Sequence, residues 1–297
     1  MAYARYAPLS DPAPYRPALW RLALGLILAA IIYIIGTFAA LLLGWRLIGP
    51  DLSFDEWSFL FAAPETPEIT LFLLLTSFPA MALGAFAAGK FLHGRGFGAY
   101  LGRAPRVIRD FAIAAGVTFG LAAITFLPVL FVGFDGLPNL DPLRWLSILP
   151  LTLLAIIVQT GAEELAFRGY LQSQLAARFK SAFVWMLVPS LLFGLVHYNP
   201  GALGENFWLP IIVATLFGLA AADLTARTGS LGAAWGIHFA NNTMGLAVIA
   251  TEGTVTGLAL FRTPYDAADP EPIGWSIAGS AILLGLSWAI TRRLTAR

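Results

Sequence analysis

The fold is decided by the apolar stretch Trp145–Val158, WLSILPLTLLAIIV, and by the polar stretch that follows it, Gly161–Tyr170, GAEELAFRGY. The first stretch has the composition of a membrane helix. The second places two carboxylates and an arginine at its end. A charge at the centre of a bilayer costs roughly 2.5–3.5 kcal/mol on insertion scales, so an ionisable residue in a membrane span is a candidate for function.

The spacing of these charges predicts different roles for the two carboxylates. Glu164 and Arg168 are four residues apart, so they share a helix face, with the glutamate first, which is the better order for an ion pair. Glu163 projects about 100° away from Glu164, because 3.6 residues make a turn. We therefore expect Glu164 to be neutralised by Arg168, while Glu163 stays free for chemistry.

The composition is that of a membrane protein. Of the 297 residues, 58% are hydrophobic and only 12% are charged, against about 25% charged in soluble domains. The net charge of +1 gives no broad basic field for nucleic acid. The chain has no cysteines, which excludes a thiol nucleophile, thiolate metal sites and disulfides.

Eight segments approach the roughly 20 apolar residues that span a bilayer. We therefore predict an all-α polytopic membrane helix bundle of about eight transmembrane helices. The predicted spans are Leu22–Trp45, Ile69–Gly89, Phe111–Val132, Trp145–Val158 and beyond, Ala182–Val196, Phe207–Ala222, Leu231–Ala250 and Ile273–Ile290.

Lysine and arginine in short loops predict the orientation of the bundle. Basic residues gather in the two tails, in the second loop from Lys90 to Arg109 and in the fourth at Arg178 and Lys180, whereas the first and last loops are acidic. This alternation agrees with eight spans and places both termini in the cytoplasm. We expect residues 1–20 to be a disordered cytosolic tail and residues 21–297 to be the bundle. We expect His93 and Gly94–Arg109 to lie at the lipid headgroups.

Two histidines lie in or at the end of apolar spans, His197 in the fifth and His238 in the seventh, with Asn242 four residues after His238. Each histidine alone could be a buried residue bonded to backbone. Polar groups in hydrocarbon need partners, however, and the simplest partners are each other and the carboxylate pair. For Glu163 and His197 to meet, the fourth helix must continue through Leu171 and Leu175.

Such a set of side chains suits peptide-bond hydrolysis. A buried carboxylate can take a proton from water, a neutral histidine can position that water or bind a metal, and His with Asn can donate to an oxyanion. If the chemistry depends on zinc, Glu163, His197 and His238 would supply three ligands and leave one position open.

Other protease classes fit the sequence less well. No His-Glu-x-x-His motif is present, and Ser230 lacks the surroundings of a Gly-x-Ser-Gly nucleophile. An aspartyl protease needs two Asp in spans, but Asp223 lies at a span end near Arg227 and Asp266 lies in a polar loop.

Three motifs together, Glu163-Glu164-x-x-x-Arg168, Phe193-x-x-x-His197 and His238-x-x-x-Asn242, resemble those of the CAAX-protease and bacteriocin-processing family, the Rce1-like intramembrane proteases. The resemblance covers about residues 145–250. It implies that Glu163 activates water with help from His197, that Glu164 and Arg168 support the site, and that His238 and Asn242 stabilise the oxyanion.

The resemblance implies an intramembrane endopeptidase of the plasma (inner) membrane of a bacterium, with the bilayer and a membrane-associated protein or peptide substrate as partners. It leaves the metal and the substrate open. A non-proteolytic scaffold or bacteriocin-immunity protein of the same fold is the main alternative. A proton-coupled transporter is a third, but it would carry inverted repeats, and none is visible in the sequence.

Overall fold

The structure is a computed structural model that describes residues 3–10, 16–96 and 98–295. Its elements, in chain order, are η1 Ala4–Tyr6, α1 Ala7–Ser10, α2 Leu19–Leu47, α3 Phe54–Ala62, α4 Pro67–His93, α5 Gly98–Leu101, α6 Ala104–Val132, β1 Leu137–Pro138, α7 Pro142–Glu164, η2 Leu165–Gln172, α8 Ser173–Arg178, α9 Ala182–Leu195, α10 Pro200–Leu203, η3 Gly204–Phe207, α11 Trp208–Thr228, α12 Gly232–Thr243, η4 Met244–Val248, β2 Ile249–Glu252, β3 Phe261–Asp266 and α13 Pro270–Leu294.

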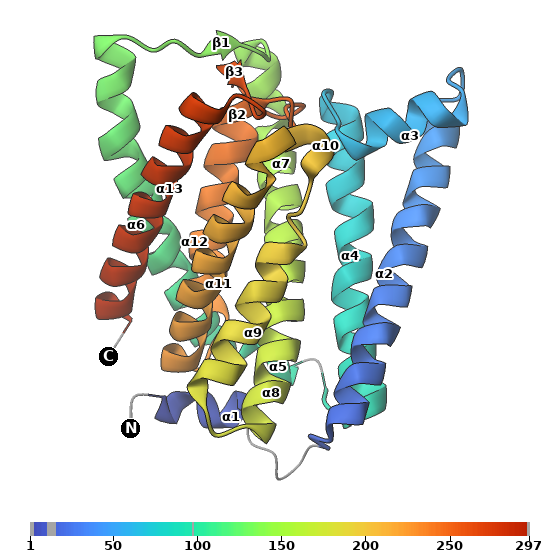
Figure 1. Cartoon of the computed structure of the whole chain (residues 1–297), viewed down its shortest axis with the longest axis vertical. Coiled ribbons are helices and arrows are strands. Elements are labelled where there is room, and N and C mark those ends of the chain that lie inside the picture. Colours follow the sequence, from blue (N-terminus) through green and yellow to red (C-terminus); the bar gives the residue numbers. More distant parts are fainter. Residues whose placement is uncertain (1–2, 11–15, 97, 296–297) are drawn as a thin grey trace.

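The long helices run along one axis and form a bundle with two distinct ends (Figure 1). One end, the sheet end, carries α3, α10 and a small sheet of order β1-β3-β2. The other, the basic end, carries α1, α5 and α8. Six helical segments of the described chain are long and apolar enough to cross a membrane. The all-α polytopic bundle is thus confirmed. The count of eight stays a prediction, because α9 and α12 are only 14 and 12 residues long.

The fourth span forms one continuous helical segment of 37 residues, Pro142–Arg178. Its start is fixed by Asp141, whose carboxylate accepts from the backbone N–H groups of Leu143 and Arg144 at 3.0 Å. After Glu164 the segment continues as the π-helix η2 and then as α8. The extension through Leu171 and Leu175 that the sequence required is therefore present.

The seventh span ends earlier than predicted. Helix α12 stops at Thr243, the π-helix η4 follows, and Ile249–Glu252 is strand β2 rather than helix. Strand β2 pairs with β3 in parallel, Ile249 opposite Phe261. The correction has a local reason, since Val248, Ile249 and Thr251 are β-branched and favour a strand once a partner strand is present.

Glycines bring α12 against α6. A side chain at Gly232 or Gly236 would collide with the backbone carbonyl of Val107 or Phe111 in α6, so this small-residue pair allows the two helices to pack closely. Gly116 and Gly120, the other pair with this spacing, have open space around them and serve no such contact.

Residues 4–10 of the described N-terminal segment pack against the bundle, although the sequence predicted a disordered tail over residues 1–20. Residues 4–10 form η1 and α1, and α2 already begins at Leu19. Tyr6 and Leu9 are buried in a cluster with Trp185 and Leu175, and the Tyr6 and Trp185 rings lie 5.4 Å apart. Burial of these apolar side chains offsets the entropy of ordering the segment. Residues 11–15 lie outside the described residues.

His93 and Arg95 are also buried, although the sequence favoured an interfacial position for both. His93 Nδ1 lies 2.8 Å from the carbonyl oxygen of Arg16, and its Nε2 lies 3.0 Å from the Tyr170 hydroxyl. Arg95 donates to Ser173 Oγ at 2.7 Å and to the carbonyl of Leu9 at 2.7 Å. These hydrogen bonds tie the N-terminal segment to η2 and α8.

Candidate active site

Glu163 and Glu164 occupy different environments, as their helical spacing predicted. Glu164 is fully buried, and its Oε1 accepts from Arg168 Nη1 at 3.0 Å. The Glu163 side chain keeps 12% exposure and lines a cavity. The predicted ion pair is confirmed, and it leaves Glu163 outside the pair.

Arg168 lies inside the π-helix η2, which begins directly after Glu164. Single π-turns within α-helices are frequent at functional sites. The buried guanidinium lies over the ring of Phe193, 4.4 Å from its centroid, and 5.1 Å from that of Phe217. Glu164 and these ring faces together compensate a charge that has lost its water.

His238 bridges the two carboxylates. Its Nδ1 lies 2.8 Å from Glu164 Oε1, and its Nε2 lies 3.3 Å from Glu163 Oε2. Nδ1 carries a proton, because it faces an acceptor that is already paired with Arg168. Nε2 and Glu163 Oε2 are close enough to interact electrostatically. Helix α12 therefore holds the His238 ring against both carboxylates.

A chain of amides connects Asn242 to Glu163. Asn242 Nδ2 donates to Gln159 Oε1 at 2.9 Å, and Gln159 Nε2 donates to Glu163 Oε1 at 2.8 Å. The sequence motifs did not identify Gln159 as a site residue. Its position could have done so, because it is a polar residue one helical turn before Glu163 in an apolar run. The Asn242 amide has a second N–H beyond the one that Gln159 receives.

Three polar atoms at the centre of the site are buried without a hydrogen-bond partner among the described residues: Glu163 Oε2, Glu164 Oε2 and Arg168 Nη2. The 3.3 Å contact of Glu163 Oε2 with His238 is within ion-pair range but is not aligned as a hydrogen bond. Buried polar groups in folded proteins are nearly always paired. Unpaired atoms at this density mark a place for water or substrate.

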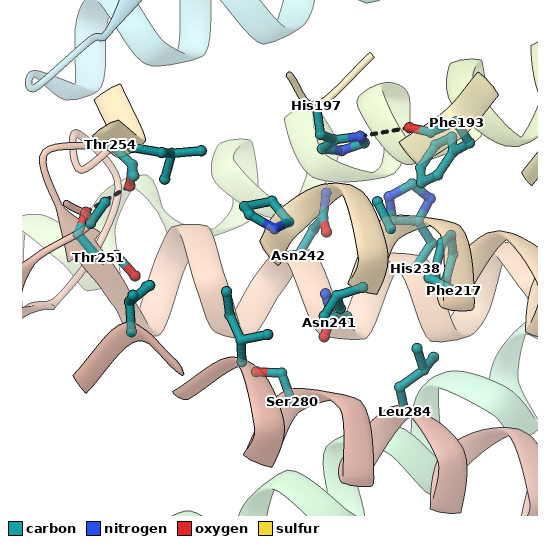
Figure 2. Close-up of a pocket in the computed structure, with 17 residues that line it drawn as sticks. Phe193, His197, Phe217, His238, Asn241, Asn242, Thr251, Thr254, Ser280 and Leu284 are labelled. Atoms are coloured by element: carbon teal, nitrogen blue, oxygen red, sulfur yellow. Dashed lines mark hydrogen bonds between the residues drawn. The ribbon is translucent and has the colours of Figure 1, made fainter. Parts of the chain in front are cut away.

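His197 lies in the turn two residues after the end of α9, and its Nδ1 donates to the carbonyl of Phe193 at 2.8 Å (Figure 2). In a neutral ring, this bond leaves Nε2 as an acceptor. His197 and Glu163 line one cavity of about 510 Å³, the Glu163 cavity. His197, His238 and Asn242 line another of about 360 Å³, the His238 cavity. The carboxylate of the fourth span and the histidine of the fifth therefore lie at one site, not a bilayer apart.

The structure thus places five of the predicted residues in one contact network and the sixth at its edge. Direct contacts join Glu163, Glu164, Arg168 and His238, and Gln159 links in Asn242. His197 shares both cavities with the network. No three His, Asp or Glu side chains of the described chain gather closely enough to hold a metal ion. Zinc binding by Glu163, His197 and His238 therefore stays a prediction.

The part of the chain that contains this network also matches a known family. Residues 145–244 match the family model described as type II CAAX prenyl endopeptidase Rce1-like. These residues are an Rce1-like domain. The Rce1-like family indicates a membrane protease of the CAAX type, and with six apolar spanning helices the chain is an integral membrane protein.

One curated relative extends the likeness beyond the Rce1-like domain. An uncharacterized protein of Bacillus subtilis (strain 168), YyaK, is 26% identical over 245 residues, which is 79% of this chain and 79% of the relative. No solved structure matches the chain.

Proposed function

We propose that the chain is an intramembrane endopeptidase that hydrolyses a peptide bond in a membrane-associated protein or peptide, with Glu163 as general base. One observation carries the proposal: Glu163 Oε2 is buried, has no hydrogen-bond partner among the described residues, and faces His238 Nε2 at 3.3 Å. A carboxylate so placed can take a proton from a water molecule that attacks a carbonyl carbon. We expect the protein to lie in the plasma membrane of a bacterium.

The neighbouring groups support each step of this reaction. His197 Nε2 and Glu163 share a cavity and can hold the attacking water between them. When water attacks, its proton passes to Glu163 and the carbonyl oxygen becomes negative. The His238 imidazole and the second N–H of Asn242 can donate to that oxygen. The leaving amine then takes the proton from Glu163. Glu164, paired with Arg168, keeps His238 oriented.

The test compares variants of purified protein in proteoliposomes on a fluorogenic membrane peptide. Glu163→Gln keeps the side-chain volume but removes the base, so we expect turnover to fall by at least about 10²-fold, the usual contribution of general-base catalysis. His197→Ala should also fall. Glu65→Gln, an exposed carboxylate in the loop before α4, is the matched control and should keep full turnover.

Two outcomes would overturn the assignment. Unchanged turnover in both Glu163→Gln and His197→Ala would remove these residues from the chemistry. A wild-type protein without turnover, in which binding of a partner survives Glu163→Gln, would favour the scaffold or immunity protein. A third outcome concerns the metal. If chelation abolishes turnover, and zinc restores it in wild type but not in His197→Ala, the mechanism depends on zinc.

A further inference from the structure

The two ends of the bundle carry opposite charge. The acidic side chains Asp51, Asp55, Glu56, Glu65, Glu68, Asp135, Asp141, Glu205, Glu252, Asp266, Asp269 and Glu271 belong to elements and loops at the sheet end. The basic side chains Arg5, Arg16, Arg21, Lys90, Arg95, Arg103, Arg106, Arg109, Arg178, Lys180, Arg227, Arg292 and Arg293 belong to the other end. Positively charged loops face the cytoplasm, so this distribution assigns the sheet end to the outer side.

The His238 cavity runs from the candidate active site toward the sheet end. At the site it is lined by His197, His238 and Asn242. Farther along it is lined by Thr251 of β2 and by Thr254, which Figure 2 shows at the opposite side of the cavity from His238. Leu203 of α10, Ala267 after β3 and Ile273 at the start of α13 complete this part of the lining.

The lining of the cavity indicates water rather than lipid. Asn241 and Ser280 line it from α12 and α13, and both are exposed. An amide that faces hydrocarbon leaves its hydrogen-bonding groups unsatisfied, which costs several kcal/mol in a bilayer. Asn241 also lines a neighbouring cavity of about 620 Å³ together with Thr118, Ser276 and Ser287. Polar side chains at membrane depth on this scale are expected where water fills the space.

The basic end, in contrast, is closed by packed aromatic side chains. Tyr6, Tyr100, Tyr170 and Trp185 belong to one buried cluster below the site. Arg95 is buried beside them and bonded to Ser173 and to the backbone of Leu9. A peptide arriving from this end would have to displace the N-terminal segment and open this cluster.

Carboxylates flank the sheet-end part of the His238 cavity. Glu205 lies two residues from Leu203, Asp266 and Asp269 lie on either side of Ala267, and Glu271 lies two residues before Ile273. The described arginines at this end are Arg46, Arg144 and Arg262. Arg144 pairs with Glu68 at 2.6 Å and Arg262 with Glu252 at 2.9 Å. The remaining field is negative, and such a field raises the local concentration of cations.

We propose that water and substrate reach Glu163 and His238 from the sheet end through the His238 cavity, and that the substrate is a cationic peptide segment on the outer side of the membrane. This inference rests on the proposed protease function and narrows its substrate class. By this inference the substrate enters the site from outside the cell and not from the cytoplasm.

The absence of native cysteine makes the route directly testable. Thr254→Cys places a thiol in the His238 cavity, and Lys180→Cys, an exposed position at the basic end, is the matched control. Each variant is treated with membrane-impermeant methanethiosulfonates, one carrying trimethylammonium and one sulfonate, in intact spheroplasts and in inverted vesicles. We expect Thr254→Cys to react in spheroplasts and Lys180→Cys to react only in inverted vesicles.

The outcomes separate cleanly. Reaction of Thr254→Cys only in inverted vesicles, or from neither side, would overturn the outer route; Ser280→Cys repeats the measurement if Thr254→Cys fails to fold.

At low salt the cationic reagent should modify Thr254→Cys at least about threefold faster than the anionic one. The combined substitutions Glu205→Gln, Asp269→Asn and Glu271→Gln should make the two rates equal. Equal rates in the parent Thr254→Cys protein would overturn the cationic class.

Labelling needs no turnover, so it tests the route even if the protein proves not to be a protease. Conversely, Glu163→Gln can lose peptide cleavage even if Thr254→Cys does not react in spheroplasts, which would overturn the route but not the protease function. In an active preparation, modification of Thr254→Cys should also lower peptide cleavage at least about tenfold, because the attached group occupies the cavity. Full cleavage after complete modification would show that substrate takes another path.

Discussion

Two acidic residues in this bundle each have an arginine four residues later, and the two pairs have different roles. Glu164 and Arg168 lie at the junction of α7 and η2, and Asp223 and Arg227 lie near the end of α11. In both pairs the nitrogen–oxygen distance is 3.0 Å. Sequence spacing alone therefore cannot tell them apart.

The hydrogen bonds around each carboxylate distinguish the two pairs. Asp223 Oδ1 accepts from the Tyr3 hydroxyl and from Arg227 Nε, both at 3.0 Å. Its Oδ2 accepts from Trp288 Nε1 at 2.9 Å and from Arg292 Nε at 3.0 Å. Around Glu164, by contrast, the second carboxylate oxygen and Arg168 Nη2 have no hydrogen-bond partner among the described residues. A carboxylate with four donors holds helices together, whereas an incompletely bonded one beside a second carboxylate leaves room for chemistry.

The largest effect is expected from Glu164→Gln. Arg168 is only 1% exposed, so the substitution leaves a buried charge without its counter-charge, which costs about 3–5 kcal/mol. We expect a matching loss of unfolding free energy in detergent micelles, measured by denaturant titration, together with loss of turnover as His238 loses its Nδ1 acceptor.

A double variant separates the two consequences. Adding Arg168→Met to Glu164→Gln removes the uncompensated charge, so stability should recover while turnover does not. If the single variant were as stable as wild type, the Glu164–Arg168 pair would not be a buried ion pair in the membrane. The proposed difference from the Asp223–Arg227 pair would then be wrong.

A smaller effect is expected from Asp223→Asn. Its two arginine partners keep 28% and 37% side-chain exposure, so water can solvate them when the charge is lost. We expect about 1.5–3 kcal/mol of destabilisation, the range for hydrogen bonds to a charged group, with turnover per folded molecule unchanged. A tenfold loss of turnover in the folded fraction would show that this cluster also serves the chemistry.

The smallest effect is expected from Tyr3→Phe, which removes one hydrogen bond to Asp223 and should cost about 0.5–1.5 kcal/mol near neutral pH. Burial, followed by the charge and hydrogen bond of Asp223, raises the pKa of Tyr3. A raised pKa means that the contribution of Tyr3 is complete below its unfolded pKa of about 10 and is lost as pH rises further. The stability difference between wild type and Tyr3→Phe should therefore shrink in alkaline denaturant titrations, and a constant difference would contradict this contact.

The sequence predicted what depends on neighbours along the helix. The Glu164–Arg168 pair, the divergence of Glu163 and the continuation of the fourth helix all follow from a 3.6-residue repeat and from apolar composition. The link from Asn242 to Gln159 spans 83 positions, and the bridge made by His238 depends on how α12 is rotated against α7. Burial of Tyr6, Leu9 and Arg95 depends on the surface that α8 and α9 present together. Such contacts are set by tertiary packing, which periodicity does not encode.

The π-helix η2 also determines the rotational phase of everything after it. Its wider turn, bonded from residue i to i+5, rotates α8 relative to α7 compared with an uninterrupted α-helix. Glu164 can therefore face His238 while Leu171 and Leu175, further along, face the aromatic cluster at the basic end. If the same sequence formed a regular α-helix throughout, all side chains after η2 would be turned by about 100°. The segment would then keep either its charges or its apolar anchor in register, but not both.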